Sequence, residues 1–347
     1  MKFPFKFGKK APKENYCIGV DIGGSAVKAV KLKFTKDSVE LCDLKIEPVA
    51  LDLPAVLKKI SDAFQVKKVN LSISGNSSIL RYISFPKMNE FELKQALKFE
   101  AEKHIPFTIS EVNLDSHILR QDLPDNKMLV LLAAAKKEVI EQRIKLAEDA
   151  ELKPSIMDID SIALINAFNF NYPLEKSADE KEKTEAKTVA ILNIGASLTN
   201  LNILEGGMPR LSRDIHFAGN NFTQKIADML GMDFSQAEAL KITPENTSVE
   251  KVTIAVDSIL SGLAIEVRTS FDYYETQSAS SVTKIYLSGG GILFKGLSEK
   301  LANLLGIEVE VWDPLKRIPL APGLAQVPQE IFVRMGVAAG LALRQEK

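Results

Sequence analysis

One short pattern occurs twice in this sequence, at positions about half the chain apart. The first copy is "GVDIGGSAVKAVKL", Gly19 to Leu32, and the second is "ILNIGASLTNLNIL", Ile191 to Leu204. In each copy, two runs typical of β-strands flank a short turn that contains glycine. A chain of 347 residues corresponds to roughly two domains, so each half carries one hairpin. The residues that fall in register are Asp21, Ile22, Gly23 and Ser25 in the first copy and Asn193, Ile194, Gly195 and Ser197 in the second.

Glycine-rich turns of this kind suit the binding of phosphate. Small residues let the backbone approach a ligand closely, and consecutive N–H groups form an anion-binding concavity. Asp21, at the end of the first strand, can hold Mg²⁺ through water, because this ion keeps several waters and takes few protein carboxylates. A third cluster, "LSGGGILFKG" (287–296), lies between a predicted strand and a predicted helix. Three glycine loops in one chain predict a nucleotide site in a cleft between the two halves.

A dinucleotide-binding fold is the main alternative for such glycines. That fold requires the spacing G-x-G-x-x-G at the start of a helix. The segment "GGSAVK" lacks this spacing, and "VKAVKLKF" alternates in polarity as a strand does. The pattern therefore disfavours a dinucleotide fold.

Composition excludes several classes of protein. With 46% hydrophobic and 26% charged residues, the chain falls in the ordinary soluble globular class. Its net charge of −1 provides no field that would attract nucleic acid. The two cysteines lack metal-ligand spacing and favour a reducing compartment. Apolar runs such as "MLVLLAAA" (128–135) are too short to span a bilayer. The lysine-rich start, "MKFPFKFGKKAPKENY", is expected to be a disordered tail, with weak contact to a membrane surface as the alternative.

Strand and helix patterns mix in both halves. Helical spacing predicts helices over 53–64 and 249–277 and a terminal helix over 330–344. Asn89, followed three residues later by Glu92, predicts an Asn variant of the capping box at the start of a helix that ends before Pro106. The run 173–187 carries five acids and four lysines and reads as a solvated connector. The class is therefore α/β with mixed sheets.

These residues resemble the actin, sugar kinase and Hsp70 superfamily. The resemblance implies two lobes around a nucleotide cleft, in a duplicated fold of the ribonuclease H-like type, and five motifs occur in the expected order. "DIDSIALINAF" resembles the first connecting helix, and "FVRMGVAAGLAL" resembles the second. ATP and Mg²⁺ are the implied ligands, with Asp21 at the metal. The implied nucleotide-binding residues are Asp21, Gly23, Gly24, Ser25, Lys28, Asn193, Gly195, Ser197, Thr199, Gly219, Glu238, Lys241, Gly289, Gly290, Gly291 and Phe294.

Three of these assignments have plain structural alternatives. Lys28 could be one more solvent-facing lysine on an alternating strand, although its spacing after Asp21 favours phosphate contact. Glu238 and Lys241 match positions that often contact the ribose, and a solvated helical face is nearly as good an interpretation. The three histidines have no cysteine or histidine partner nearby in the sequence, which favours structural positions over a metal site.

Within the superfamily, the chain resembles the PilM family of type IV pilus assembly. The resemblance rests on "FGKK" before the first hairpin, on residues 85–119, and on the ending "GLALR". FtsA-like proteins, which share the inserted subdomain, usually end in a membrane-targeting helix, whereas this chain stops at "LALRQEK". The implied divisions are 1–85 for the first part of subdomain 1A, 86–150 for the inserted subdomain 1C, 151–187 for the return to 1A with the connector, 188–225 for 2A, 226–282 for 2B, and 283–347 for 2A with the final helix.

Two residues bear on hydrolysis. Relatives that hydrolyse ATP typically carry an acid at the second phosphate loop, where this chain has Asn193. An amide contributes no negative charge to hold a metal ion. Asp160 stands where relatives carry the residue that orients the attacking water; a helix N-cap is its alternative role. We therefore expect slow or absent hydrolysis, with ATP as a structural or switching ligand.

The resemblance implies a cytoplasmic scaffold of pilus assembly, or of the related type II secretion. Its implied partner is the N-terminal cytoplasmic tail of a PilN-like inner-membrane protein, docked between the first subdomain and the insert. Pilus motor components are implied as further partners, and self-association is also implied. Nucleic acid and a direct membrane span are not expected. Two alternatives stay open: a small-molecule kinase of the same fold, for which no strong candidate base is visible, and an FtsA-like filament-forming protein.

Overall fold

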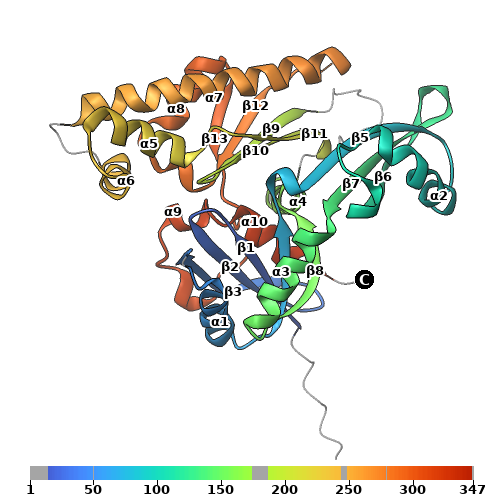
Figure 1. The fold of residues 1–347 in the computed structure, drawn as a ribbon, viewed down its shortest axis with the longest axis horizontal. Helices are drawn as coiled ribbons and strands as arrows, with labels where there is room; N and C mark the ends of the chain where they lie inside the picture. Colours follow the sequence, from blue (N-terminus) through green and yellow to red (C-terminus); the bar gives the residue numbers. More distant parts are fainter. Residues whose placement is uncertain (1–14, 50, 174–186, 244–247, 279, 346–347) are drawn as a thin grey trace, which may run out of the picture.

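The computed structural model describes residues 15–49, 51–173, 187–243, 248–278 and 280–345. The lysine-rich start and most of the charged connector, whose character was predicted above, lie outside the described residues. Figure 1 shows two lobes, with a smaller unit extending from the side of the first lobe.

The two lobes are built on sheets of the same topology. In the first sheet, the order is β3-β2-β1-β4-β8, and in the second it is β11-β10-β9-β12-β13. Each sheet begins with an antiparallel meander whose first strand then pairs in parallel with a later strand. The repeat seen in the sequence is therefore a repeat of the fold. The first-lobe strands are β1 (Asn15–Ile22), β2 (Ala26–Phe34), β3 (Val39–Pro48), β4 (Lys68–Ile73) and β8 (Lys153–Ile159). The second-lobe strands are β9 (Thr188–Ile194), β10 (Thr199–Glu205), β11 (Met208–Ile215), β12 (Lys284–Ser288) and β13 (Glu308–Val311).

The glycine hairpins connect antiparallel strands. Gly23 and Gly24 join β1 to β2, and Gly195 joins β9 to β10. A dinucleotide-binding fold would place a helix directly after the first glycines. The topology rules that alternative out.

Helices cover the sheets and hold the lobes together. The long helix α7 runs along the second sheet (Figure 1) and buries Val256, Leu263 and Phe271 in the core of that lobe. Between the sheets, α4 and α10 share one buried cluster with residues from both lobes. The helices are α1 (Leu53–Phe64), α2 (Glu90–Glu100), α3 (Lys137–Asp149), α4 (Asp160–Asn171), α5 (Gly219–Leu230), α6 (Phe234–Ile242), α7 (Val249–Gln277), α8 (Leu297–Leu305), α9 (Gln329–Phe332) and α10 (Gly336–Leu343).

The smaller unit has its own core. Its three-stranded sheet has the order β5-β7-β6, with β5 (Ser78–Pro86), β6 (Val112–Leu123) and β7 (Lys127–Lys136). Helix α2 packs Leu93 and Leu97 onto this sheet. The predicted capping box is confirmed, because Asn89 accepts from the Glu92 amide at 2.9 Å and Glu92 accepts from the Asn89 amide at 2.9 Å.

Two predictions about elements are wrong or incomplete. The expected terminal helix is broken into α9 and α10, because the carbonyl of Val333 accepts the Gly289 amide at 2.9 Å instead of continuing the helix. Strands β5 and β11 were not predicted. Most of their residues are half-buried, so neither strand shows a clear alternation of polar and apolar residues.

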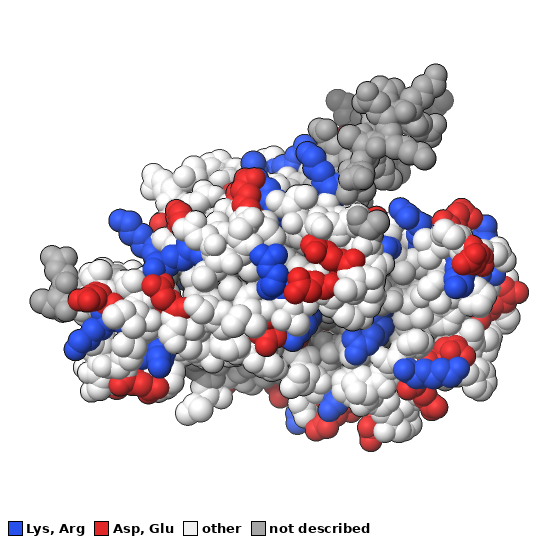
Figure 2. Space-filling model, turned by 90° about the horizontal axis from the view of Figure 1, so that it is seen from above, with Lys and Arg blue, Asp and Glu red and all other residues white. Residues whose placement is uncertain are grey.

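The surface carries mixed charge. On the face above α7, Lys and Arg side chains are interspersed with Asp and Glu (Figure 2). Within the described residues, no helix has an apolar stretch long enough to cross a membrane.

Candidate functional site

The tips of the two hairpins meet between the lobes. A Cβ atom placed on Gly24 would lie 2.3 Å from the Ser197 Oγ. Because Gly24 has no side chain, its backbone can lie directly against Ser197 of the other hairpin. Beside the tips lies a cavity of about 300 Å³, which we call the hairpin cavity. Its lining includes the predicted residues Asp21, Gly23, Gly24, Ser25, Lys28, Asp160, Asn193, Gly195, Ser197 and Gly290.

Equivalent positions of the two hairpins carry different chemistry. In the first, Asp21 faces Lys28 across the strands, and the Lys28 Nζ lies 2.7 Å from the Asp21 Oδ2. In the second, Asn193 faces Asn200, and the Asn193 Nδ2 donates to the Asn200 Oδ1 at 3.1 Å. A charged pair thus stands on one side of the cavity and a neutral amide pair on the other.

Asp160 lies at the centre of a polar network that borders the cavity. The Asn200 Nδ2 donates to the Asp160 Oδ2 at 3.1 Å and to the Asp214 Oδ1 at 2.7 Å. Burial raises the pKa of Asp160 well above its usual range, and the nearby Asp214 carboxyl raises it further. Burial also raises the pKa of Asp214, although the hydrogen bond from Asn200 opposes this. A proton is therefore favoured on this carboxyl pair.

Asp160 is not the N-cap of helix α4, which was its alternative predicted role. Helix α4 begins at Asp160 itself, and its N-cap position is Ile159. The Asp160 Oδ1 accepts the Ser161 amide at 2.7 Å, so the carboxyl group is fixed at the first turn.

The third glycine loop packs against the second hairpin. Gly289 has a φ of +98°, and an added Cβ there would lie 2.3 Å from the Ile194 carbonyl oxygen. At Gly291, an added Cβ would lie 2.4 Å from the Ile194 Cγ2. Glycine is required at position 289 because two backbones approach this closely, and at position 291 because an added Cβ would overlap the Ile194 side chain. The loop thereby brings Gly290 to the cavity lining.

Other predicted residues lie behind the cavity lining. Gly219 packs on the Gly195 carbonyl, and Thr199 donates its hydroxyl to the Phe217 carbonyl at 2.6 Å. Phe294 is buried in the core of the second lobe. Lys241 is buried, and its ammonium contacts the Gly219 carbonyl at 3.3 Å and the Glu238 carboxylate at 2.6 Å. Glu238 and Lys241 thus form an ion pair at the start of α5.

Several residues of the cavity were missed by the sequence analysis. Arg143 from α3 and Arg334 from the α9–α10 break line it, as do Ser74 and Asn200. Asn200 could have been found, because it occupies in the second hairpin the place of Lys28 in the first. No sequence signal marks the two arginines.

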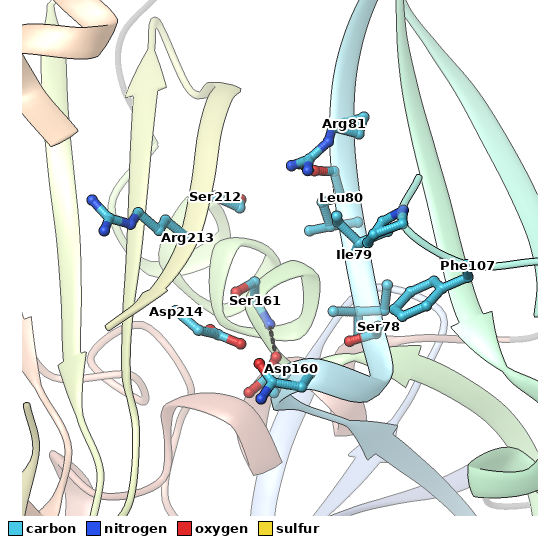
Figure 3. A pocket seen from close by; sticks show the side chains of 14 residues that line it. Ser78, Ile79, Leu80, Arg81, Phe107, Asp160, Ser161, Ser212, Arg213 and Asp214 are labelled. Atoms are coloured by element: carbon cyan, nitrogen blue, oxygen red, sulfur yellow. Dashed lines mark hydrogen bonds between the residues drawn. The ribbon is translucent and has the colours of Figure 1, made fainter. Parts of the chain in front are cut away.

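A second hollow lies on the other side of Asp160. This groove has a volume of about 450 Å³ and runs between β5 of the small unit and β11 of the second lobe. Figure 3 shows Ile79 and Phe107 on one wall, Asp214 on the other, and Asp160 with Ser161 at the base. Tyr82 and Ser212 join the two walls through hydroxyls 2.8 Å apart. Both β5 and β11 are edge strands of their sheets.

Comparison with known proteins identifies the family. The family described as "Type IV pilus assembly protein PilM" matches this chain over residues 19–346. The chain belongs to the PilM family. Its fold is therefore actin-like, as the resemblance implied.

Two solved structures agree with this membership. One is the PilM-PilN type IV pilus biogenesis complex, at 28% identity and a TM-score of 0.81 over 94% of this chain and 97% of that one. Another is the ethanolamine utilization protein EutJ from Carboxydothermus hydrogenoformans, at 14% identity and a TM-score of 0.57 over 96% and 91% of the two chains. The second shows a shared fold only. The family match favours neither a small-molecule kinase nor an FtsA-like filament protein.

Proposed function

We propose that this chain is a cytoplasmic scaffold of type IV pilus assembly that binds ATP with Mg²⁺ and docks the N-terminal tail of a PilN-like inner-membrane protein. The observation that carries the proposal is the pair of hollows on either side of Asp160. One is built from phosphate-type glycine loops, and the other lies between two strand edges. The likeness to a PilM-PilN complex supports the second assignment. The subdomain boundaries given above, with 86–150 as the insert, belong to this proposal.

In this proposal, the nucleotide phosphates occupy the hairpin cavity. The amides of Gly23 and Gly195 close the turns on the Ala26 and Leu198 carbonyls. The remaining amides of the two turns would bind the anion, as such turns do in other phosphate sites. The start of α5 lies behind the cavity lining and is held in place by Gly219, Glu238 and Lys241. The third glycine loop borders the nucleoside. Glu238 and Thr223 are hydrogen-bonded to each other and to Lys241, so this support is rigid.

The donor set fits a magnesium ion held mainly by phosphate and water. Asp21 is the candidate carboxylate, and within the described residues no group of three His, Cys, Asp or Glu side chains could hold a metal. Mg²⁺ is commonly bound through one or two carboxylates plus substrate phosphates. When bound, the ion would neutralise phosphate charge. Lys28 holds the Asp21 carboxylate in place at 2.7 Å.

The groove suits an extended peptide. Edge strands present unpaired N–H and C=O groups, and a peptide can add to such an edge with its side chains in alternate pockets. Strand β5 supplies one edge and β11 the other. Ile79, Leu80 and Phe107 provide apolar lining, while Ser78, Ser161 and Ser212 provide hydroxyls. If the apolar pockets dominate binding over the charged lining residues Arg81, Arg213 and Asp214, binding should be largely insensitive to salt.

A peptide titration tests the docking site. A fluorescent peptide with the sequence of the PilN-like N-terminal tail is titrated against the whole protein and against Ile79→Asp, which places a charge in the groove. The matched control is Ile83→Asp: both residues lie on β5 and pack against the same core, but Ile83 does not line the groove. We expect at least a roughly tenfold loss for Ile79→Asp alone. Equal affinities for both variants would place the peptide elsewhere.

Backbone methylation tests the mode of binding. Tail peptides that carry a single N-methyl group lose one hydrogen-bond donor each. If the peptide adds to an edge strand, methylation should weaken binding at every second position of the peptide. The reason is that the N–H groups of a strand point alternately toward and away from the neighbouring strand. Uniform tolerance of methylation would contradict β-strand addition while leaving the groove as the site.

Calorimetry tests the nucleotide assignment. ATP is titrated into the protein with Mg²⁺ and with a chelator, and the same is done for Asp21→Asn. We expect the substitution to weaken binding mainly in the presence of Mg²⁺, with the exposed Asp62→Asn unchanged. Absence of ATP binding by the folded wild-type protein would refute the assignment.

A further inference from the structure

Among the described residues, no carboxylate forms an ion pair with either of two arginines that line the hairpin cavity. Arg143 lies on α3 and Arg334 in the break between α9 and α10, and both line the cavity. The Arg334 Nε is buried and has no hydrogen-bond partner within the part of the chain that the structure describes. Burial lowers the pKa of Arg334, and no opposite charge offsets that effect. Arg143 is also desolvated, with only the field of Asp21 to offset the lowering of its pKa.

Several other cations of the described residues have carboxylate partners. Lys28 is paired with Asp21 at 2.7 Å and the buried Lys241 with Glu238 at 2.6 Å. Arg210 and Arg213, which are more exposed, also have carboxylate partners. An unpaired, desolvated cation costs free energy. Two of them in one cavity indicate a site prepared for an anion that is bound in the functional state.

The two side chains enter from different parts of the fold. Arg143 comes from the first lobe and lies in the field of Asp21 at the first hairpin. Arg334 lies by the third loop, since a Cβ added to Gly290 would be 3.6 Å from its Nε. The carbonyl of the preceding residue, Val333, accepts the Gly289 amide at 2.9 Å and thereby fixes Arg334 beside this loop. The cavity is thus bounded by a guanidinium at each of two glycine loops.

We propose that Arg143 and Arg334 are direct ligands of the nucleotide phosphates. This inference rests on the proposed nucleotide function. A guanidinium binds phosphate oxygens through two parallel hydrogen bonds, which a lysine cannot reproduce. Arg143, beside Asp21 and the first hairpin, contacts the terminal phosphate. Arg334, beside the third loop, contacts a phosphate nearer the nucleoside. The break in the C-terminal helix therefore has a role, because it delivers Arg334 to the cavity.

Binding of ATP and ADP by the whole protein tests the two assignments. We expect Arg334→Gln to weaken both nucleotides by about tenfold or more and Arg143→Gln to weaken ATP much more than ADP, because hydrogen bonds to charged groups are the strong ones. Arg334→Lys recovers only part of the affinity. The control is Arg120→Gln, an exposed position on β6. If wild-type protein binds ATP and both Gln variants bind it equally well, the inference is wrong and the proposed function stands.

A melting experiment without nucleotide separates the two claims. Removal of a half-buried cation that has no counter-ion among the described residues should raise the melting temperature of Arg334→Met above that of wild type. Inorganic tripolyphosphate should raise the melting temperature of wild type but not that of the Arg143→Gln/Arg334→Gln double variant. If tripolyphosphate stabilises the protein through these arginines while ATP does not bind, the arginine site stands and the nucleotide assignment fails. Equal stabilisation of wild type and double variant overturns the inference.

Discussion

The side-chain amide of Asn200 donates a hydrogen bond of 3.1 Å to the buried carboxyl group of Asp160. The same amide nitrogen also donates to Asp214, at 2.7 Å. Asn200 therefore joins two carboxyls that line the groove to the lining of the hairpin cavity. Because burial raises the pKa of both acids, the network links the protonation of this pair to the stability of the site.

The stability that Asp160 contributes should be lost as the pH rises above about 4, the pKa of an ordinary aspartate. In the unfolded chain, Asp160 loses its proton near its ordinary pKa, whereas the folded protein holds the proton to higher pH. Between those two values the unfolded chain binds fewer protons, so a rise in pH favours unfolding. The substitution Asp160→Asn removes this pH-dependent contribution to stability and keeps an oxygen that can accept the hydrogen bond from Asn200. We expect the variant to gain stability relative to wild type as the pH rises above about 4.

Thermal melts at several pH values check this expectation. The difference in melting temperature between Asp160→Asn and wild type should grow with pH by about 2 °C or more. Asp272→Asn, on the exposed face of α7, is the control and should show no such trend. A difference that stays constant or shrinks with pH would mean that Asp160 is ionised in the folded protein.

Asn193→Asp should raise the rate of ATP hydrolysis from a low wild-type value. The substitution restores an acid beside the cavity, and an interaction made in the transition state changes kcat more than affinity. It also replaces the Asn193 donor that reaches the Asn200 Oδ1 at 3.1 Å, so a loss of stability of about 1 kcal/mol should accompany it. Steady-state phosphate release and melting curves measure the two effects. Rapid hydrolysis by the wild-type protein would contradict the expectation.

Lys241→Met should weaken the start of α5 and, through it, nucleotide binding. The Lys241 ammonium is buried and bonds to Gly219, Thr223 and Glu238. Its removal takes away three hydrogen bonds and leaves Glu238 without its cation, while the Thr223 hydroxyl stays as a donor to Gly219 and Glu238. We expect a cost of about 1–3 kcal/mol. Chemical denaturation measures the loss, and Lys251→Met, at an exposed position of α7, is the matched control. A variant as stable as the control would show that the network is dispensable.

Gly340→Ala should separate α10 from α4. A Cβ added at Gly340 would lie 1.7 Å from the Ala163 carbonyl oxygen, whereas at Gly323 no atom lies within 4 Å. Overpacking of this kind costs about 1–3 kcal/mol or more. Gly323→Ala is therefore the control, with little expected change. Equal melting temperatures for the two variants would show that the helices can move apart freely.

The sequence by itself determined the repeated part of the fold and several of its helices. The hairpins, α1 and α7 were predicted with the bounds that the structure has, or within a few residues of them. The capping box of α2 was also predicted from Asn89 and Glu92. Local signals suffice for such elements, because capping, turn chemistry and apolar periodicity depend on residues close together in the sequence.

The tertiary structure decided which residues come together at the groove and at the hairpin cavity. Strands β5 and β11 face each other across the groove, so their residues are half-buried on both faces and carry no simple period. The C-terminal helix breaks because the Val333 carbonyl is used by Gly289. Arg143 and Arg334 reach one cavity from distant parts of the chain. These features depend on contacts between the lobes, which local periodicity does not encode. The hairpins could therefore be predicted from the sequence, whereas the arginines beside them required the fold.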